Sequence, residues 1–181
     1  MNRWSPSEVV RNQFFEDDSR KDASFVEVMQ EQNGDTTYYA SAVRKFRGFV
    51  DASGRNFVDD VILYRYADVL LMIAEAKNAL GQDPSSEINE VRQRAYGENF
   101  SSYQFVNGSQ ENNDQEILQE RLLELAFEGK RWWDLVRFGK AFDLVPSLQN
   151  RQGDQHLLLW PIPQSSMSLN GDLEQNPGYT L

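Results

Sequence analysis

Two helical segments separated by a very short turn constrain the fold of this chain more than any other feature. In the stretch "DDVILYRYADVLLMIAEAKNALG", which ends at Gly81, apolar residues recur at the three- and four-residue spacing of an α-helix. Gly81 lacks a Cβ and suits the left-handed position that ends a helix. Asp83 and Pro84 follow at once and can start a second helix, Asp83 as its N-cap and Pro84 in its first turn. Helices joined by so short a loop run antiparallel, so the sequence predicts a helical hairpin.

Apolar periodicity extends this helical region to about residue 142. On the first helix, the residues expected to face the core are Leu63, Ala67, Leu70, Leu71, Ala74 and Leu80. On the second helix, which should end at Gly97, they are Ile88, Val91, Ala95 and Tyr96. A third helix is expected to begin near Asn113, with Glu116 as its capping-box partner. Its apolar face should comprise Leu118, Leu122, Leu125 and Ala126, widened by Leu123 and Phe127. Gly129 predicts a break, followed by a shorter fourth helix to Ala141.

Composition divides the chain into three parts. Residues 1–59 combine charged, turn-rich stretches with the strand-like segment "TTYYASAVRKFRGFV", and are expected to be irregular with short strands. Residues 60–142 form the helical core. Residues 143–181 are expected to form an extended tail packed on the helices, because Pro146, Pro161, Pro163 and Pro177 forbid long helices. The predicted fold class is therefore mainly α, with antiparallel helical hairpins, irregular loop-rich segments and short strands.

Charge and residue usage exclude several classes of function. The formal net charge of -10 argues against nucleic acid as a partner, because an acidic surface repels phosphates. The chain has no cysteine and a single histidine, His156, so neither a metal site nor another cofactor is expected. No apolar run is long enough to span a membrane, and the N-terminus lacks a signal-peptide core. If the protein is exported, we expect its export signal to lie outside this chain.

The stretch "ERLLELAFEGKRWWDLVRFGKA" poses a choice between catalysis and structure. Glu120, Glu124 and Glu128 lie four residues apart, and paired carboxylates beside aromatic rings can cleave glycosidic bonds. A catalytic acid, however, needs surroundings that raise its pKa. Here every carboxylate has a cation within one turn: the expected pairs are Arg121 with Glu124, Arg131 with Glu128 and Asp134, Arg137 with Asp134, and Lys130 with Asp134. Trp133 and Arg137 could also form a cation–π pair. These cations should lower the carboxylate pKa values, so a structural ladder is favoured and no catalytic residue is expected.

Other aromatic and imidazole side chains have ordinary structural explanations. His156, Tyr64 and Tyr66 are expected to serve packing rather than catalysis or ligand binding. Four aromatic residues outside the strong helices could stack on sugar rings, although packing competes with this role: Trp4, Phe14, Tyr38 and Tyr39. They are the candidate ligand-binding residues.

Four blocks of the sequence carry a resemblance to a known family. Residues 63–81, 88–97, 117–141 and 158–179 occur in the order found in the C-terminal portion of the SusD/RagB family of nutrient-binding outer-membrane lipoproteins. The central block is similar to the family pattern E-R-x-x-E-L-x-F-E-G-x-R-x-x-D-L-x-R. The matching positions are Glu120, Arg121, Glu124, Leu125, Phe127, Glu128, Gly129, Arg131, Asp134, Leu135 and Arg137. We expect this signature, together with Trp133, to hold the C-terminal helices together.

The resemblance implies a fold, a function and a location. It implies TPR-like helical hairpins and a non-catalytic protein that captures oligosaccharide or polysaccharide at the cell surface. Such proteins deliver the ligand to a SusC-like TonB-dependent transporter from the outer leaflet of the outer membrane, held there by a lipid anchor, which is expected to lie outside this chain. A complete member also has an N-terminal half, so the chain is expected to expose an apolar flank that this half, or a second copy, would cover.

Two alternatives to glycan capture remain open at this point. Helical hairpins also build protein–protein interaction scaffolds with no carbohydrate role. The Glu-rich helix could, less favourably, belong to an all-helical glycosidase.

Overall fold

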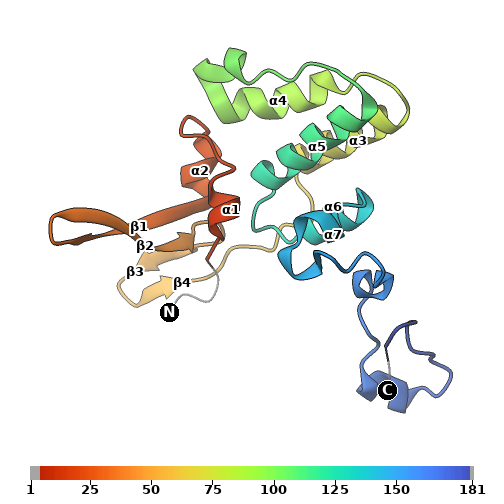
Figure 1. Cartoon of the computed structure of the whole chain (residues 1–181). Helices are drawn as coiled ribbons and strands as arrows, with labels where there is room; N and C mark the ends of the chain where they lie inside the picture. The colour runs from red at the N-terminus through yellow and green to blue at the C-terminus, as the bar shows by residue number, and fades with distance from the viewer. Residues whose placement is uncertain (1–4, 180–181) are drawn as a thin grey trace. The chain divides into compact units, whose positions relative to one another are not determined.

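The computed structural model describes residues 5–179. The chain forms two compact units, one up to residue 131 and one from residue 132 (Figure 1). Within residues 5–179, helices that are long and apolar enough to cross a membrane are absent.

Three helices form the body of the first unit: α3 (Tyr66–Ala79), α4 (Ser85–Tyr96) and α5 (Gln110–Glu124). A 3-10 helix, η1 (Gly97–Ser102), follows α4 directly. As Figure 1 shows, α3 lies beside both α4 and α5. Their facing sides bury Leu70, Leu71, Ala74, Ile88, Val91, Ala95, Tyr96, Ile117 and Leu118. The predicted hairpin is confirmed, and so is the inward face predicted for the second helix.

The first helix is shorter than predicted at its N-terminal end. It begins at Tyr66 because Arg65 has an extended backbone, with φ -142° and ψ 165°. Leu63 therefore lies before the helix and is 72% exposed, while Leu80 lies just beyond it and is 73% exposed. Both were predicted to be inward and both predictions are wrong. The apolar spacing extends to the N-terminal side of Arg65, but the helix does not, because distant carboxylates hold the Arg65 side chain.

The third helix also differs from the prediction at both ends. It starts at Gln110, before Asn113, because the Ser109 hydroxyl caps it by accepting from the Asn112 amide at 3.3 Å. It ends at Glu124, ahead of the break expected at Gly129. Between them Phe127 has φ 66°, so the chain leaves the helical conformation before the glycine.

The N-terminal part of the first unit contains two short helices and two small antiparallel hairpins. The helices are α1 (Glu8–Arg11) and α2 (Ser19–Ser24), and the strands are β1 (Phe25–Gln32), β2 (Asp35–Val43), β3 (Phe49–Asp51) and β4 (Gly54–Asn56). Strand β1 pairs with β2 from Phe25 opposite Val43 to Gln32 opposite Asp35, with an irregularity after Val28. The tight turn uses Asn33 and Gly34 at φ 55° and 88°.

A small hydrophobic cluster fastens this N-terminal part to the helices. Phe14 and Phe25 meet edge to face at 5.4 Å between ring centroids and pack with Leu123 and Ala126. Phe14 comes from the segment after α1, Phe25 from the start of β1, and the other two from the end of α5 and just beyond. The N-terminal segment is therefore anchored on the helix that carries the glutamates.

An apolar flank of the expected kind is present on α3. Val69, Met72 and Ile73 follow helical spacing and remain more than one-third exposed. This is the face that a further part of the protein or a second copy is predicted to cover.

The second unit consists of short helices joined by irregular chain. These are α6 (Arg131–Arg137), α7 (Ala141–Leu144), η2 (Pro146–Leu148), η3 (Gln155–Leu158) and α8 (Gln164–Leu169). The Gln175 side chain bonds both backbone groups of Ile162, at 2.8 and 2.9 Å. The imidazole of His156 contacts the Tyr179 ring edge to face at 5.1 Å.

Candidate functional site

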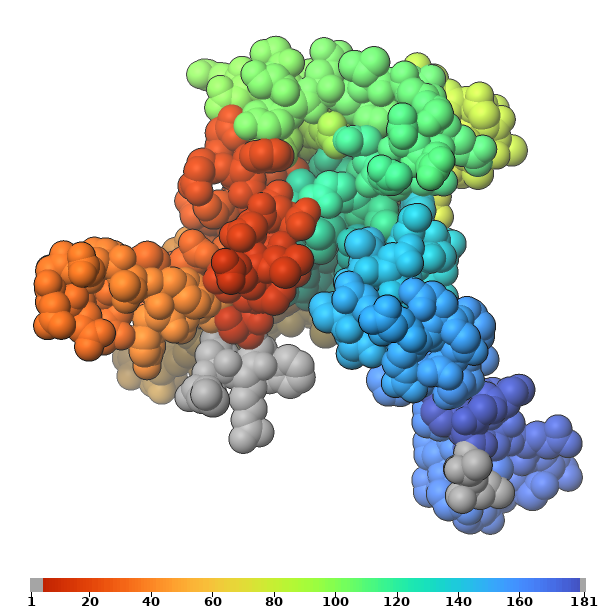
Figure 2. Space-filling view, viewed as in Figure 1, coloured from red at the N-terminus to blue at the C-terminus, as the bar shows by residue number. Residues whose placement is uncertain are grey.

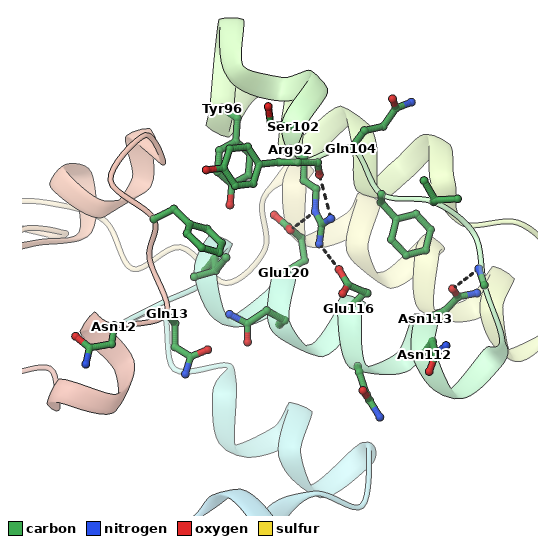
Figure 3. Close-up of a pocket in the computed structure, with 18 residues that line it drawn as sticks. Asn12, Gln13, Arg92, Tyr96, Ser102, Gln104, Asn112, Asn113, Glu116 and Glu120 are labelled. Carbon is green, nitrogen blue, oxygen red and sulfur yellow. Dashed lines mark hydrogen bonds and ion pairs between the residues drawn. The ribbon is translucent and has the colours of Figure 1, made fainter.

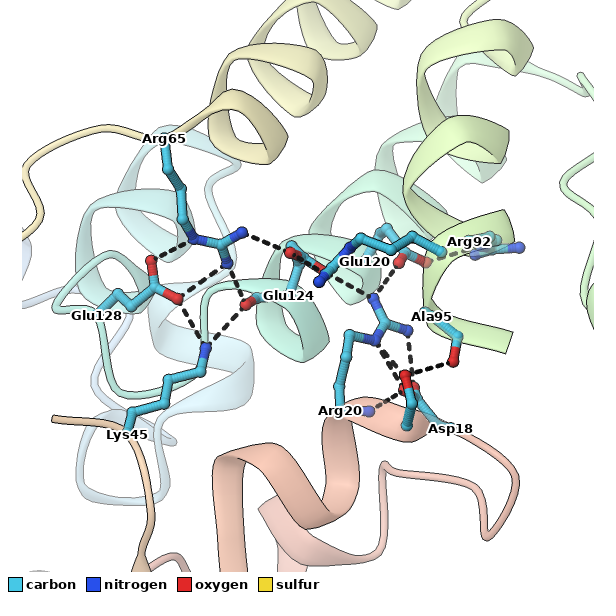
Figure 4. Close-up of polar contacts among 11 residues, drawn as sticks. Asp18, Arg20, Lys45, Arg65, Arg92, Ala95, Glu120, Glu124 and Glu128 are labelled. Carbon is cyan, nitrogen blue, oxygen red and sulfur yellow. Dashed lines mark hydrogen bonds and ion pairs between the residues drawn. The ribbon is translucent and has the colours of Figure 1, made fainter. Parts of the chain in front are cut away.

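The central glutamate of the signature is buried among cations. Glu124 is 2% exposed and accepts hydrogen bonds from three arginines that lie on different parts of the first unit (Figure 4). The distances are 3.3 Å to Arg20 Nη1, 2.6 Å to Arg65 Nη1 and 2.5 Å to Arg94 Nη2. One carboxylate thus ties α2, the segment before α3, and α4 to α5.

The flanking glutamates extend this ion network in both directions. Glu120 accepts from Arg20 Nη1 at 2.5 Å and from Arg92 Nε at 2.7 Å. Arg20 also pairs with the buried Asp18 at 2.7 Å. Glu128 accepts from Lys45 Nζ at 2.7 Å and from Arg65 Nε at 2.9 Å. The three glutamates are therefore all held by cations from outside α5 and the turn that follows it.

This result corrects the predicted local ladder. Arg121 pairs with Asp68 of α3 at 3.1 Å in place of Glu124, and Lys130 pairs with the same Asp68 at 3.0 Å in place of Asp134. Spacing along one helix identified the charges but not their partners, because Arg20, Lys45 and Arg65 arrive from distant parts of the chain.

A predicted pair is present at the end of the signature. Asp134 accepts from Arg137 at 2.8 Å, three residues away, as expected. Arg131 donates to the carbonyl of Leu118 at 2.8 Å. The Arg137 guanidinium lies 5.5 Å from the ring centroid of Phe138. Trp133 itself is 56% exposed.

The electrostatics of the network oppose acid catalysis. Burial alone would raise the pKa of Glu124 and of Glu128, but hydrogen bonds from Arg65 and the nearby cations lower both pKa values below the ordinary range. Burial would likewise lower the pKa of Arg20, and its carboxylate partners raise it instead. These glutamates are held as anions, and the prediction of a lowered carboxylate pKa is confirmed for both. Residues 5–179 contain no group of three or more His, Asp or Glu side chains placed to hold a metal ion.

Acid should weaken the fold through these same groups. The folded pKa values of Glu124 and Glu128 lie below the ordinary value of 4.5, so the unfolded chain binds protons first. Their stabilising contribution is complete above about pH 4.5 and is lost as the pH falls through the lowered folded pKa. Urea unfolding between pH 6 and pH 3 should show a falling midpoint, and a Glu124→Gln/Glu128→Gln variant should show a shallower fall. If the urea midpoint fell equally with pH in the wild type and in the double variant, Glu124 and Glu128 would not be the groups responsible.

A cleft of about 750 Å³ lies beside the network in the first unit (Figure 3). Its walls are the 12–15 segment after α1, the end of α4 with η1 and the chain that follows, and one face of α5. In Figure 2 the red surface of the N-terminal segment adjoins the green surface of these helices. The floor is marked by Arg92, Glu116 and Glu120.

Side-chain amides dominate the polar lining of this cleft. The lining amides are Asn12, Gln13, Gln104, Asn112, Asn113, Gln115 and Gln119. Asn113 is structural, because its Nδ2 donates to Asn78 and Asn107 and its Oδ1 accepts from Gly108. Gln119, by contrast, is partly exposed and faces the cleft from the middle of α5. Each amide offers both a donor and an acceptor, which matches the hydroxyl groups of a sugar.

Aromatic rings form the other part of the lining. Tyr96 and Tyr103 stack with centroids 3.9 Å apart and planes 9° apart, and Phe15 leans on Tyr103 at 5.3 Å. Burial and the nearby Asp18 raise the pKa of Tyr96, and a hydrogen bond to Asp17 raises that of Tyr103, so both phenols stay neutral. Phe15 is 56% exposed and presents its ring at the rim.

The sequence-based ligand candidates lie elsewhere. Phe14 is buried in the cluster with Phe25 and is not available to a ligand. Tyr38 lies under the Arg11 guanidinium at 4.1 Å and donates its hydroxyl to Ser41, while Tyr39 is exposed on β2. Trp4 lies outside the described residues. The cleft lining does not include Phe14, Tyr38 or Tyr39.

Sequence reasoning missed the cleft because it considered aromatic rings and charged groups as site candidates and did not consider side-chain amides. One signal was available: Asn112, Gln115, Glu116 and Gln119 follow the three- and four-residue spacing of a single polar helix face. The opposing wall, with Phe15 and Tyr103, is separated from that face in sequence and could not be placed from spacing.

Comparison with known proteins identifies the family. The sequence model of the SusD family matches residues 15–155, which is more than half of the chain. The chain belongs to the SusD family. The residues matched include the ion network of Glu120, Glu124 and Glu128 and every residue that lines the cleft except Asn12 and Gln13.

Individual SusD relatives agree with this assignment. SusD-like protein P38 of Formosa agariphila is 38% identical over 130 residues, covering 67% of this chain and 25% of the relative. The starch-binding protein SusD of Bacteroides thetaiotaomicron is 33% identical over 128 residues, covering 66% of this chain and 22% of that protein.

Solved structures show the same fold. B. fragilis NanU superposes with a TM-score of 0.79 at 38% identity, covering 96% of this chain and 39% of that structure. A SusD superfamily protein from Bacteroides fragilis superposes with a TM-score of 0.82 at 31% identity, covering 97% of this chain and 40% of that structure. The fold is mainly α and TPR-like, as predicted. The chain spans about a quarter of the length of the curated relatives and about 40% of the solved ones.

Proposed function

We propose that this chain is part of a non-catalytic, cell-surface nutrient-binding protein that captures oligosaccharide and delivers it to a SusC-like TonB-dependent transporter. Membership of the SusD family supports the glycan-binding class. The observation that carries the proposal to this chain is the cleft between the 12–15 segment, η1 and α5, lined by amides and aromatic rings.

The chemistry of the cleft suits sugars. Ligand sites combine apolar surface with a few placed polar groups, and here an exposed ring, Phe15, stands opposite the amide of Gln119. A sugar presents an apolar ring face and a rim of hydroxyls, so it can use both walls at once. One SusD relative is named a starch-binding protein, which is consistent with a glycan ligand here.

The glutamate network supports a binding role without catalysis. Glu120, Glu124 and Glu128 are all engaged by cations, and a glycosidase needs one carboxyl group whose pKa is raised. The network supports the walls of the cleft, since Glu120 reaches Arg92 on its floor. We place the whole protein at the outer face of the outer membrane as a lipoprotein, as is general for the family.

A competing function is a protein–protein scaffold of TPR type. The exposed stripe of Val69, Met72 and Ile73 on α3 favours it, because contiguous apolar surface marks an interface. The two functions are compatible if the flank docks the rest of the protein and the cleft takes the ligand.

Glycan binding is tested by an array of neutral oligosaccharides followed by calorimetry on the binders. Gln119→Ala should weaken binding about fivefold, because it removes one hydrogen bond worth about 1 kcal/mol. Phe15→Ala should weaken it by a similar factor through loss of the ring face. Transport is tested by growth on the bound glycan after deletion of the gene.

Tyr39→Ala is the control, since Tyr39 is also an exposed aromatic residue but lies on the β1–β2 hairpin. It should leave the affinity unchanged. Binding lost in Tyr39→Ala and kept in the two cleft variants would move the site to the hairpin. Absence of binding across the array would contradict the proposed function.

A further inference from the structure

The floor of the cleft contains an ion pair whose role goes beyond holding the fold. Among the residues that line the cleft, Arg92 is the only cation, and it faces two carboxylates, Glu116 and Glu120. Arg92 donates from Nε to Glu120 Oε2 and from Nη2 to Glu116 Oε2, both at 2.7 Å. Its Nη1 donates to the carbonyl of Tyr103 at 3.1 Å. Figure 3 shows these bonds converging on the guanidinium.

The two carboxylates differ in how tightly they are held. Glu120 is buried and shared between Arg92 and Arg20, so it belongs to the network that stabilises the unit. The Glu116 side chain is half exposed, on the solvent side of Arg92. Burial would lower the pKa of Arg92, whereas Glu120 and Glu116 raise it, so the guanidinium stays charged and engaged.

This arrangement determines what charge a ligand can carry. A carboxylate on a sugar would seek the guanidinium, because arginine binds carboxylates through paired hydrogen bonds. Glu116 already takes that position and presents its own negative charge to the cleft. The other polar side chains of the lining are neutral amides and hydroxyls, so an anionic ligand meets two carboxylates against one guanidinium, on a chain of net charge -10.

The neutral lining offers unoccupied hydrogen-bonding groups to an uncharged ligand. Within the described chain, five lining amides make no side-chain hydrogen bond to protein: Asn12, Gln104, Asn112, Gln115 and Gln119. They surround Glu116 along α5 and across the cleft. Hydroxyl groups can exchange donors and acceptors with such amides without displacing the ion pair.

We propose that Glu116 is the charge-selecting residue of this cleft: by occupying Arg92 it admits uncharged sugars and turns away sugars that carry a carboxylate. This rests on the proposed function, because it specifies the ligand class of the same cleft. It assigns Glu116 a role in specificity that a purely structural surface ion pair would not have.

The experiment compares matched ligands. Neutral trisaccharides of glucose, mannose and xylose are titrated beside hexose trisaccharides in which one C6 hydroxymethyl group is oxidised to a carboxylate, and beside a glucuronate-substituted xylotriose. The wild-type chain should bind its preferred neutral sugar at least tenfold more tightly than the acidic counterpart at low salt. Glu116→Gln should narrow that ratio to about threefold or less, because Arg92 then has a hydrogen-bonding position open to the ligand carboxylate. Added salt should also narrow the wild-type ratio.

Glu111→Gln is the matched control on the same helix. Glu111 is exposed and does not line the cleft. Because each variant replaces one Glu by Gln, Glu111→Gln has the same net charge as Glu116→Gln. It should keep the wild-type ratio. Urea unfolding of both variants verifies that the fold is retained.

Each outcome decides the proposal. A wild-type chain that binds acidic and neutral sugars equally, or prefers the acidic ones, overturns the charge selection while glycan binding stands. If Glu116→Gln leaves the ratio of neutral to acidic sugar affinity unchanged, Glu116 is not the charge-selecting residue. The same follows if Glu111→Gln changes that ratio equally. No binding of any sugar by the wild-type chain removes the proposed function itself.

Discussion

Glu124→Gln is expected to lower the free energy of unfolding by about 3 kcal/mol. Breaking a buried ion pair by removing one partner costs about 3–5 kcal/mol, because the other charge is left without compensation in a poorly solvated place. Glu124 serves Arg20, Arg65 and Arg94 together. The expected loss lies at the lower end of the range because Arg20 keeps Glu120, Arg65 keeps Glu128, and Arg94 reaches solvent.

The measurement is urea unfolding followed by circular dichroism near neutral pH, and Glu111→Gln again provides the control. Both substitutions remove one negative charge from α5, but Glu111 is exposed, so its change should stay within about 1 kcal/mol. Equal stability losses in the two variants would show that Glu124 acts only through the overall charge of the helix.

Phe14→Ala is expected to destabilise the chain by about 3–4 kcal/mol, and Phe15→Ala by less than about 1 kcal/mol. Removing a buried phenylalanine side chain costs about 3–5 kcal/mol through lost transfer energy and the cavity left behind. Phe14 packs on Phe25, Leu123 and Ala126, whereas its neighbour Phe15 is more than half exposed at the rim of the cleft. Adjacent residues of the same type thus serve two purposes.

The two Phe variants should separate stability from binding. Thermal and urea unfolding should show the loss in Phe14→Ala, and calorimetry with a bound glycan should show the loss in Phe15→Ala. Because Phe14 joins the N-terminal segment to α5, Phe14→Ala should also increase amide hydrogen exchange in β1. A folded, fully stable Phe14→Ala that fails to bind sugar would restore Phe14 as a ligand residue.

The amount of fold predictable from sequence differs from element to element. All four inward residues predicted for α4 are buried, because local signals define its limits: the Asp83 carboxylate accepts from the Ser85 amide at 2.8 Å, and Gly97 has φ 52°. The N-cap is Pro84 and not Asp83 as predicted, so the helix starts one residue late. The start of α3 was misplaced, because the conformation of Arg65 is fixed by Glu124 and Glu128 some 60 residues later. The spacing of nearby residues cannot predict a partner so distant in the sequence.

The candidate site was predicted less well than the fold. The lowered pKa values predicted for the carboxylates are found at Glu124 and Glu128, although the cations that lower them come from other elements. Their partners were wrong, because helical spacing favours neighbours three or four residues away, whereas burial favours arginines that approach from other elements. The ligand candidates were chosen as aromatics outside strong helices, and Phe14 shows that this position is equally compatible with a core.

The sequence by itself determined that the chain is helical, acidic, free of cysteine and marked by a family signature from Glu120 to Arg137. These properties depend on local spacing and on residue type alone. Only the tertiary structure decided which charges meet and where a ligand can enter. The cleft exists because the 12–15 segment, η1 and α5 come together in space, and the charge of its floor depends on Arg92 lying between Glu116 and Glu120. Ion-pair partners and concave surfaces arise from contacts between distant segments, and such contacts are settled by packing.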